Sequence, residues 1–199
     1  MSAKPVFILF GSVLVISVAA GFVGFKMQPD ISPVPSEISS VNKPQTSLTS
    51  VDSPDGKMIA TIDETVQSSG NKIYSVTVQD AEKSDEAVNI LKTAYSAQTR
   101  LILPKNAWSP NNRYLFLKEE TRSSSSFFVY KANGEGFAED SKFLDVVPIF
   151  SSKNTGFELI DVTGWDSNTL LHIKAVNKEG SRANFWFEVP SGVVIRLAR

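Results

Sequence analysis

The sequence predicts an all-β fold, an array of about three four-stranded antiparallel units behind one N-terminal transmembrane helix. Three observations lead to this prediction. Residues 6–25 are apolar and carry no charge. From residue 46 onward, short runs of β-branched and aromatic residues alternate with Gly, Asn, Ser and Pro clusters, as strands and turns do. In this region a single turn sequence recurs at a wide and regular spacing, which is typical of repeat architectures.

The N-terminal segment Val6–Phe25 reads VFILFGSVLVISVAAGFVGF and lies between Lys4 and Lys26. Twenty helical residues rise about 30 Å, the thickness of a bilayer's hydrocarbon core. We therefore predict that residues 1–26 form a cytoplasmic tip and an uncleaved transmembrane helix. Long domains cross a membrane largely regardless of their charge, so we place the remainder outside the cytoplasm, on a single-pass cell-membrane protein.

Cleavage of this segment is the alternative. Small residues at Ser17-Val18-Ala19 have the spacing that a signal peptidase reads, and cleavage near Ala19 would release a secreted protein. The apolar run continues past Ala19 to Phe25, however, and a cleavable signal's apolar region is usually only about 7–15 residues long.

Residues 27–45 are predicted to form a linker. The stretch is rich in Pro, Ser and Thr and contains no aromatic residue. Proline removes backbone donors and favours extended conformations, and the segment has too little apolar surface to offset its ordering entropy. The third predicted domain, residues 46–199, follows this linker.

Composition limits the chemistry that the chain can perform. Lys and Arg number 20 and Asp and Glu 21, giving a net charge of −1, so no overall field attracts nucleic acid. The chain has no Cys and a single His, which excludes thiolate chemistry and a multi-histidine metal site. We predict no cofactor, no metal and no nucleic-acid partner.

The strand-like runs group into three sets of four. Tyr114-Leu115-Phe116-Leu117 is apolar at every position, as a strand covered on both faces would be. Asp80–Lys92 has some helical character, but we interpret it as a charged loop that leads into a strand at Val88–Leu91. The predicted strands are 46–51, 57–64, 72–79 and 88–92; then 99–107, 113–119, 126–132 and 142–147; then 157–164, 169–176, 183–189 and 192–197.

The recurring turn is Ser53-Pro54-Asp55-Gly56-Lys57, matched position by position by Ser109-Pro110-Asn111-Asn112-Arg113. A weaker third copy follows Trp165 and is one residue shorter. Pro presets φ at the start of such a turn, Asp or Asn bonds its own backbone, and Gly or Asn accepts positive φ. The turn is thus predicted to mark a repeating unit and not to be a binding site.

This pattern resembles the WD40-like propeller repeat of TolB, the tricorn protease and the dipeptidyl peptidase IV N-terminal domain. In that family a W-S-P-D-G-K-x-[IL]-[AV] stretch joins the first strand of a blade to the second. Asp52 stands where Trp is usual in the first copy, and the second copy has Trp108 but lacks Asp-Gly. The resemblance implies a propeller-like array of about three blades and protein or peptide partners. A closed propeller typically has 4–8 blades, so three would form an open arc with apolar flanks or would close by forming a homodimer.

No residues form a recognisable catalytic or binding constellation. We interpret Ser123–Ser126 as a hairpin connection, His172 as a strand residue, and Trp108, Trp165 and Trp186 as core residues. The adjacent acids Glu119-Glu120, Asp85-Glu86 and Glu139-Asp140 would point to opposite sides of a strand and be solvated. Catalytic, cofactor-binding and metal-binding residues are therefore predicted to be none.

We predict a non-enzymatic, membrane-tethered module outside the cytoplasm that binds a protein or peptide or serves as a scaffold, through its loops or an open blade edge. Two alternatives remain. One is an envelope structural component that self-associates, and the other is an accessory subunit of a peptidase-type enzyme.

Overall fold

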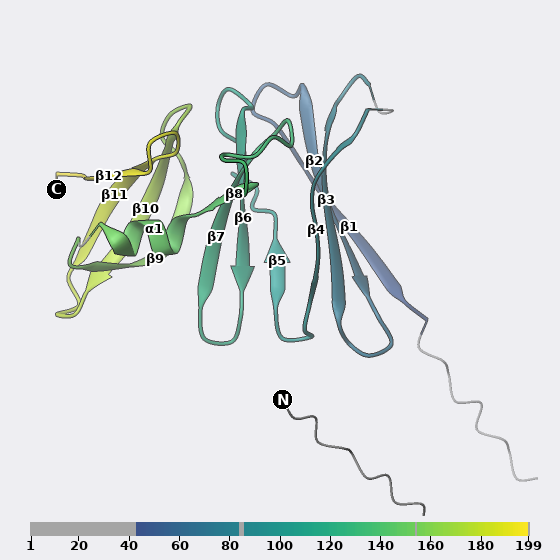
Figure 1. Cartoon of the computed structure of the whole chain (residues 1–199), viewed down its shortest axis with the longest axis horizontal. Coiled ribbons are helices and arrows are strands. Elements are labelled where there is room, and N and C mark those ends of the chain that lie inside the picture. Colours follow the sequence, from purple (N-terminus) through teal and green to yellow (C-terminus); the bar gives the residue numbers. More distant parts are fainter. Residues whose placement is uncertain (1–42, 84–85, 154, 199) are drawn as a thin grey trace, which may run out of the picture. The chain divides into compact units, whose positions relative to one another are not determined.

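The computed structural model describes residues 43–83, 86–153 and 155–198. The predicted transmembrane helix and nearly all of the predicted linker lie outside these residues. Within the described residues, no helix is long and apolar enough to cross a membrane. The described residues form three four-stranded antiparallel sheets and one short helix, which confirms the predicted fold class at this level (Figure 1).

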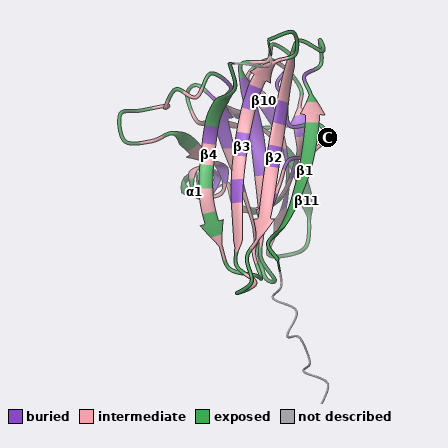
Figure 2. Cartoon of the chain, turned by 90° about the vertical axis from the view of Figure 1, so that its right-hand side faces the viewer, coloured by how far each residue is buried: buried purple, intermediate pink, exposed green. Residues whose placement is uncertain are grey.

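The first sheet contains four consecutive strands in the order β1-β2-β3-β4. Alternation along β2 and β3 gives this sheet one buried face, and buried residues alternate with half-buried ones along both strands (Figure 2). The predicted loop and strand after Asp80 are confirmed, although the last strand is longer than expected. The strands are β1 (Gln45–Asp52), β2 (Met58–Val66), β3 (Lys72–Asp80) and β4 (Val88–Tyr95).

The second and third sheets repeat this up-and-down order. The second sheet contains β5 (Arg100–Ile102), β6 (Tyr114–Glu120), β7 (Ser125–Lys131) and β8 (Phe143–Asp145). The third contains β9 (Phe157–Trp165), β10 (Leu170–Asn177), β11 (Arg182–Glu188) and β12 (Val193–Arg196). The helix α1 (Val146–Ser152) connects them.

Two predicted strands of the second sheet are wrong at one end. The strand expected at 99–107 ends at Ile102, because Pro104 begins a turn that is closed by a bond from the Ala107 amide to the Pro104 carbonyl. The strand expected at 142–147 ends at Asp145. That residue caps α1 by accepting a bond from the Val147 amide, so the chain turns into a helix that the sequence analysis did not predict.

Each sheet has two faces, and the repeat gives them distinct roles. We call the face on the side of the following sheet the forward face, and the face on the side of the preceding sheet the rear face. In the first sheet the rear face is the one that points away from the second sheet, and in the third sheet the forward face is the one that points away from the second sheet. The forward face of the first sheet (Ala60, Ile62) packs on the rear face of the second (Leu115, Leu117). The forward face of the second sheet, which includes Phe116, packs on the third sheet and α1. The second sheet is therefore buried on both faces, as the Tyr114–Leu117 run predicted.

The rear face of the first sheet is richer in hydroxyl groups than the expected apolar flank. Thr61 lies between Ser50 of β1 and Thr77 of β3, and the Ser50 and Thr61 hydroxyls are 2.9 Å apart. Ser75, on the same face, accepts a bond from the Asn89 side chain. A polar outer surface is what a terminal repeat needs to stay in contact with water.

Candidate functional site

The two matched turns have the same internal hydrogen bonds. In the first, the buried Ser53 hydroxyl accepts from the Met58 amide at 2.9 Å and donates to Asp55. In the second, the buried Ser109 hydroxyl accepts from the Tyr114 amide at 2.9 Å and donates to Asn111. This one-to-one match confirms the turn alignment that the sequence predicted.

Glycine and asparagine occupy the one position of the turn that requires positive φ. Gly56 has φ of +73° and Asn112 has φ of +59°, the only such value for a non-glycine residue in the described chain. Asn tolerates this conformation better than most residues because its side chain is short and polar. The exchange keeps the turn and adds a side-chain amide that glycine lacks.

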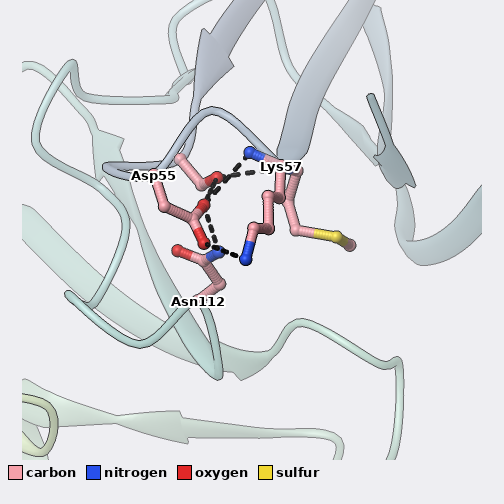
Figure 3. A network of polar contacts seen from close by, with 5 residues as sticks. Asp55, Lys57 and Asn112 are labelled. Carbon is pink, nitrogen blue, oxygen red and sulfur yellow. Dashed lines mark hydrogen bonds and ion pairs between the residues drawn. The ribbon is translucent and has the colours of Figure 1, made fainter. Parts of the chain in front are cut away.

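That added amide links the two turns. The Asn112 side chain donates to Asp55 Oδ1 at 2.6 Å, while the Lys57 ammonium lies 3.8 Å from Oδ2 (Figure 3). The bond from Asn112, the Lys57 backbone amide and the Ser53 hydroxyl lower the pKa of Asp55 to about 2. The first and second sheets are thus joined at their turn ends by a carboxylate that is ionised at all ordinary pH values.

Indole groups join the sheets at a second repeating position. Trp108 Nε1 donates to the Val51 carbonyl of the first sheet at 3.0 Å, and Trp165 Nε1 donates to the Ala107 carbonyl at 2.8 Å. The acceptors, Val51 and Ala107, directly precede positions 52 and 108, which are the Trp positions of the first and second copies of the turn. A further contact brings the Asn106 amide to the Thr163 carbonyl. It needs Gly164, because a Cβ there would lie 2.7 Å from Asn106 Nδ2.

A groove of about 590 Å³ lies beside the Asp55–Asn112 contact, between the first and second sheets. Its apolar lining includes Met58, Val78 and Tyr114. Its charged lining comprises Lys57, Asp80, Lys83, Glu86, Arg113, Lys131 and Glu135. The volume lies within the range of ligand pockets, whereas the lining is more strongly charged than is usual for them.

Two cations of the groove are available for a ligand. The Arg113 guanidinium lies 5.9 Å from the centre of the Tyr114 ring, and the Lys131 ammonium lies 5.3 Å from that of Phe137. Neither forms an ion pair with a carboxylate of the described residues. Aromatic faces hold such cations in place without neutralising them.

The serine run and the single histidine are not brought together. Ser123–Ser125 line a different groove, of about 780 Å³, with Val147 and Ser151, and His172 is not among its lining residues. The described chain also contains no cluster of three or more His, Cys, Asp or Glu side chains that could hold a metal ion.

The acids that are adjacent in the sequence do not act as pairs, because the members of each pair have different surroundings. Glu119 accepts a bond from the Tyr95 hydroxyl of the first sheet, whereas Glu120 lies 2.6 Å from the Lys118 ammonium. Burial, followed by the contact with Glu119, raises the pKa of the Tyr95 phenol. Glu139 and Asp140 are exposed, Glu86 lines the groove, and Asp85 lies outside the described residues.

Sequence reasoning missed a cluster on the third sheet. Asp166 Oδ2 accepts from Trp186 Nε1 at 2.6 Å and lies 3.2 Å from His172 Nδ1. Trp108 is a core residue as predicted, and Trp165 packs against the second core. Trp186 belongs to neither core, because it lies on the face opposite Phe185 and Phe187. This cluster could be found only from the strand register, which pairs His172 with Trp186.

No protein-family model matches the sequence, and no curated protein matches it. Two solved structures of the AtxE2 isopeptidase are similar in fold at 11% sequence identity. The serine-to-alanine variant with astexin3-dC4 bound has a TM-score of 0.48, covering 78% of this chain and 30% of that one. The apo structure has a TM-score of 0.49 and covers 77% and 30%. The chain thus spans under a third of that protein, and a likeness at this level carries no argument about activity.

Proposed function

We propose that the chain is a membrane-tethered, non-catalytic binding module outside the cytoplasm. Its three sheets act as propeller-like blades, and the groove at their turn end binds a peptide segment that carries carboxylate groups. The tether and its orientation rest on the sequence of residues 6–25 and the linker that follows. The repeating indole and turn contacts support the propeller-like interpretation, because they join successive sheets in one recurring way.

The availability of Arg113 and Lys131 is the observation that supports this ligand class. Both cations lie over aromatic rings in a groove whose floor is partly apolar. A peptide can place an apolar side chain on Met58 and Tyr114 and a carboxylate beside the guanidinium. Charge-assisted hydrogen bonds of this kind are the strong ones in recognition.

A phage library of random peptides, selected on the full-length chain in detergent, tests the proposal. We expect enrichment of acidic peptides. The double variant Arg113→Gln/Lys131→Gln should bind the enriched peptides at least about tenfold more weakly, as expected when charge-assisted bonds are lost. The matched control is Arg122→Gln/Lys105→Gln, which removes two exposed cations outside this groove. Equal binding by the groove variant and the wild type would overturn the proposal.

A further inference from the structure

Each four-stranded sheet has two edge strands, whose outer side has no partner strand in that sheet. Proteins limit the pairing of such edges with other chains by making them short, charged or irregular in register. Five of the six edge strands of the described chain have at least one of these features. β5 and β8 have three residues and β12 has four, whereas β4 contains Lys92 and β9 contains Glu158 and Asp161. β4 and β9 also pair with register shifts.

The remaining edge strand, β1, has none of these protective features. It contains eight residues, Gln45–Asp52, and pairs with β2 without a register shift. Its only charged residue is Asp52, at its end. Residues 45–50 are all exposed, and β1 forms the exposed border of the first sheet (Figure 2). This edge is therefore open to another strand along most of its length.

Strand geometry determines which backbone groups of β1 point outward. In an antiparallel pair, the amide and carbonyl of one residue point to the same side, and successive residues alternate. The Ser53 amide donates to the Met58 carbonyl, so the odd-numbered residues of β1 also point their groups toward β2. The even-numbered residues Thr46, Leu48 and Ser50 point theirs away from β2, where no described residue bonds them.

The side chains of these outward-pointing residues lie on the rear face of the first sheet. Leu48, at the centre, is the most exposed large apolar side chain in the described chain, at 68%. The Thr46 hydroxyl lies 3.2 Å from that of Thr65, and the Ser50 hydroxyl lies 2.9 Å from that of Thr61. A hydroxyl both donates and accepts, so each retains capacity for a further bond. The edge thus presents one apolar side chain between two hydroxyl groups.

We propose that β1 pairs with β1 of a second copy of the chain, antiparallel and with Leu48 opposite Leu48. The outward-pointing residues are spaced symmetrically about Leu48, so Thr46 of each copy lies opposite Ser50 of the other. Residues of such pairs exchange two backbone hydrogen bonds, so every outward amide and carbonyl of Thr46, Leu48 and Ser50 gains a partner. The same edge serves both copies, as a two-fold symmetric dimer requires.

The sequence of β1 favours a second copy as the occupant of this edge. The register places leucine against leucine and hydroxyl against hydroxyl on one face of the combined sheet. Residues 45–51 carry no charge, so no like charges meet across the contact. Pro44, which has no amide, lies opposite Asp52 in this register and limits the pairing to the uncharged residues. The strand is therefore complementary to itself.

The proposed membrane tether is compatible with this dimer. Antiparallel pairing places the two Gln45 residues at opposite ends of the paired strands, about 20 Å apart at 3.4 Å per residue. Residues 27–44 separate β1 from the predicted membrane helix and can span roughly 60 Å when extended. Two copies tethered in one membrane can therefore reach each other through this edge.

Sedimentation velocity of the full-length chain in detergent, over a concentration series, tests this contact. We expect a monomer–dimer equilibrium, because a contact made by one strand pair is small. Leu48→Lys and Leu48→Glu should each weaken dimerisation about tenfold or more, since like charges then lie opposite each other. An equimolar mixture of the two variants should dimerise again, because opposite charges meet in the mixed dimer. The matched control, Ile195→Lys, changes an exposed apolar residue of the edge strand β12 and should dimerise like the wild type.

Leu48→Cys tests the register directly, because the chain contains no other cysteine. The Cα atoms of opposite residues in a hydrogen-bonded pair lie about 5.5 Å apart, within the range that a disulfide spans. Mild oxidation should therefore link Leu48→Cys into a covalent dimer at protein concentrations that leave Ile195→Cys monomeric. Equal linking of the two variants would overturn the proposed register.

Far-UV circular dichroism and thermal melting establish that each variant is folded before its association is compared. A wild type that is monomeric at every concentration overturns the proposal. So does association that Leu48→Lys leaves unchanged, as contact through residues 6–25 alone would give, and so does a mixture of the Lys and Glu variants that stays monomeric. No residue of β1 lines the peptide groove, so Arg113→Gln/Lys131→Gln should dimerise like the wild type. Failure of the peptide proposal and failure of this one are thus distinguishable.

Discussion

At the residue scale, one asparagine takes the place of a glycine and adds a bond between sheets. Turn chemistry alone predicted that Asn112 would replace Gly56, because both residues accept positive φ. The bond from Asn112 to Asp55 could not be predicted in this way. It depends on how close two turns from different sheets come, and that distance is set by the core between them.

Replacing Asn112 by Gly tests the role of this bond. Glycine keeps the backbone conformation but loses the donor, so the pKa of Asp55 should rise from about 2 towards its ordinary value near 3.8. A carboxylate whose pKa is lowered on folding stabilises the folded state at pH values above the pKa of the unfolded state. This stabilisation is lost as the pH falls from about 3.8 to about 2. The variant should therefore lose some of this contribution.

The measurement is an NMR titration of the Asp55 carboxyl carbon in both proteins. The control is Asn133→Gly, at an exposed position in another turn, which should leave the Asp55 pKa unchanged. An Asp55 pKa that is the same in Asn112→Gly and the wild type would contradict the role assigned to the side-chain amide.

At the element scale, local patterns predicted the hairpins well and the helix not at all. The strand predicted at 142–147 includes Val146 and Val147, whose β-branched side chains favour a strand. Two features reverse this preference. Asp145 caps the helix, and burial of Val146 and Phe150 in the core between the second and third sheets stabilises it. Tertiary burial of this kind cannot be inferred from a seven-residue window.

Trp108→Phe and Trp165→Phe measure the indole bonds between sheets. Phenylalanine keeps an apolar ring but cannot donate to the Val51 or Ala107 carbonyl. We expect each change to lower the free energy of unfolding by about 0.5–1.5 kcal/mol, measured by urea denaturation followed by far-UV circular dichroism. The two sites are adjacent, because the Ala107 carbonyl that accepts from Trp165 belongs to the peptide unit preceding Trp108, so the double variant should deviate from additivity. An additive double variant would show that the two contacts are independent.

At the scale of the whole molecule, the second sheet is the element that makes three sheets one folding unit. Three sets of four strands were predicted correctly because the turn sequence recurs at a spacing that accommodates four strands and their connections. The polar character of the rear face of the first sheet was not predicted. Hydroxyl groups around Thr61 cover a face that the open-arc prediction expected to be apolar. Strand alternation places these residues, but only the assembled core shows which face lacks a neighbour.

Phe116→Ala and Leu117→Ala test whether the three sheets unfold as one unit. The residues are neighbours in β6, yet their side chains are fully buried in different cores. Each change should lower stability by about 2–5 kcal/mol, and the unfolding transitions followed by tryptophan fluorescence and circular dichroism should stay coincident. Glu179→Ala, in an exposed turn, is the control. Two separate transitions in either core variant would mean that the sheets unfold independently.

The up-and-down order of the strands also has a consequence for synthesis of the chain. Every strand pairs with its neighbour in sequence, and every sheet is complete within one continuous stretch. Native pairing therefore involves short loops and follows the direction in which the chain is made, the condition under which folding is fast. The first sheet emerges with its Tyr74, Val76 and Val78 face uncovered, and the next stretch to be translated supplies the surface that covers it.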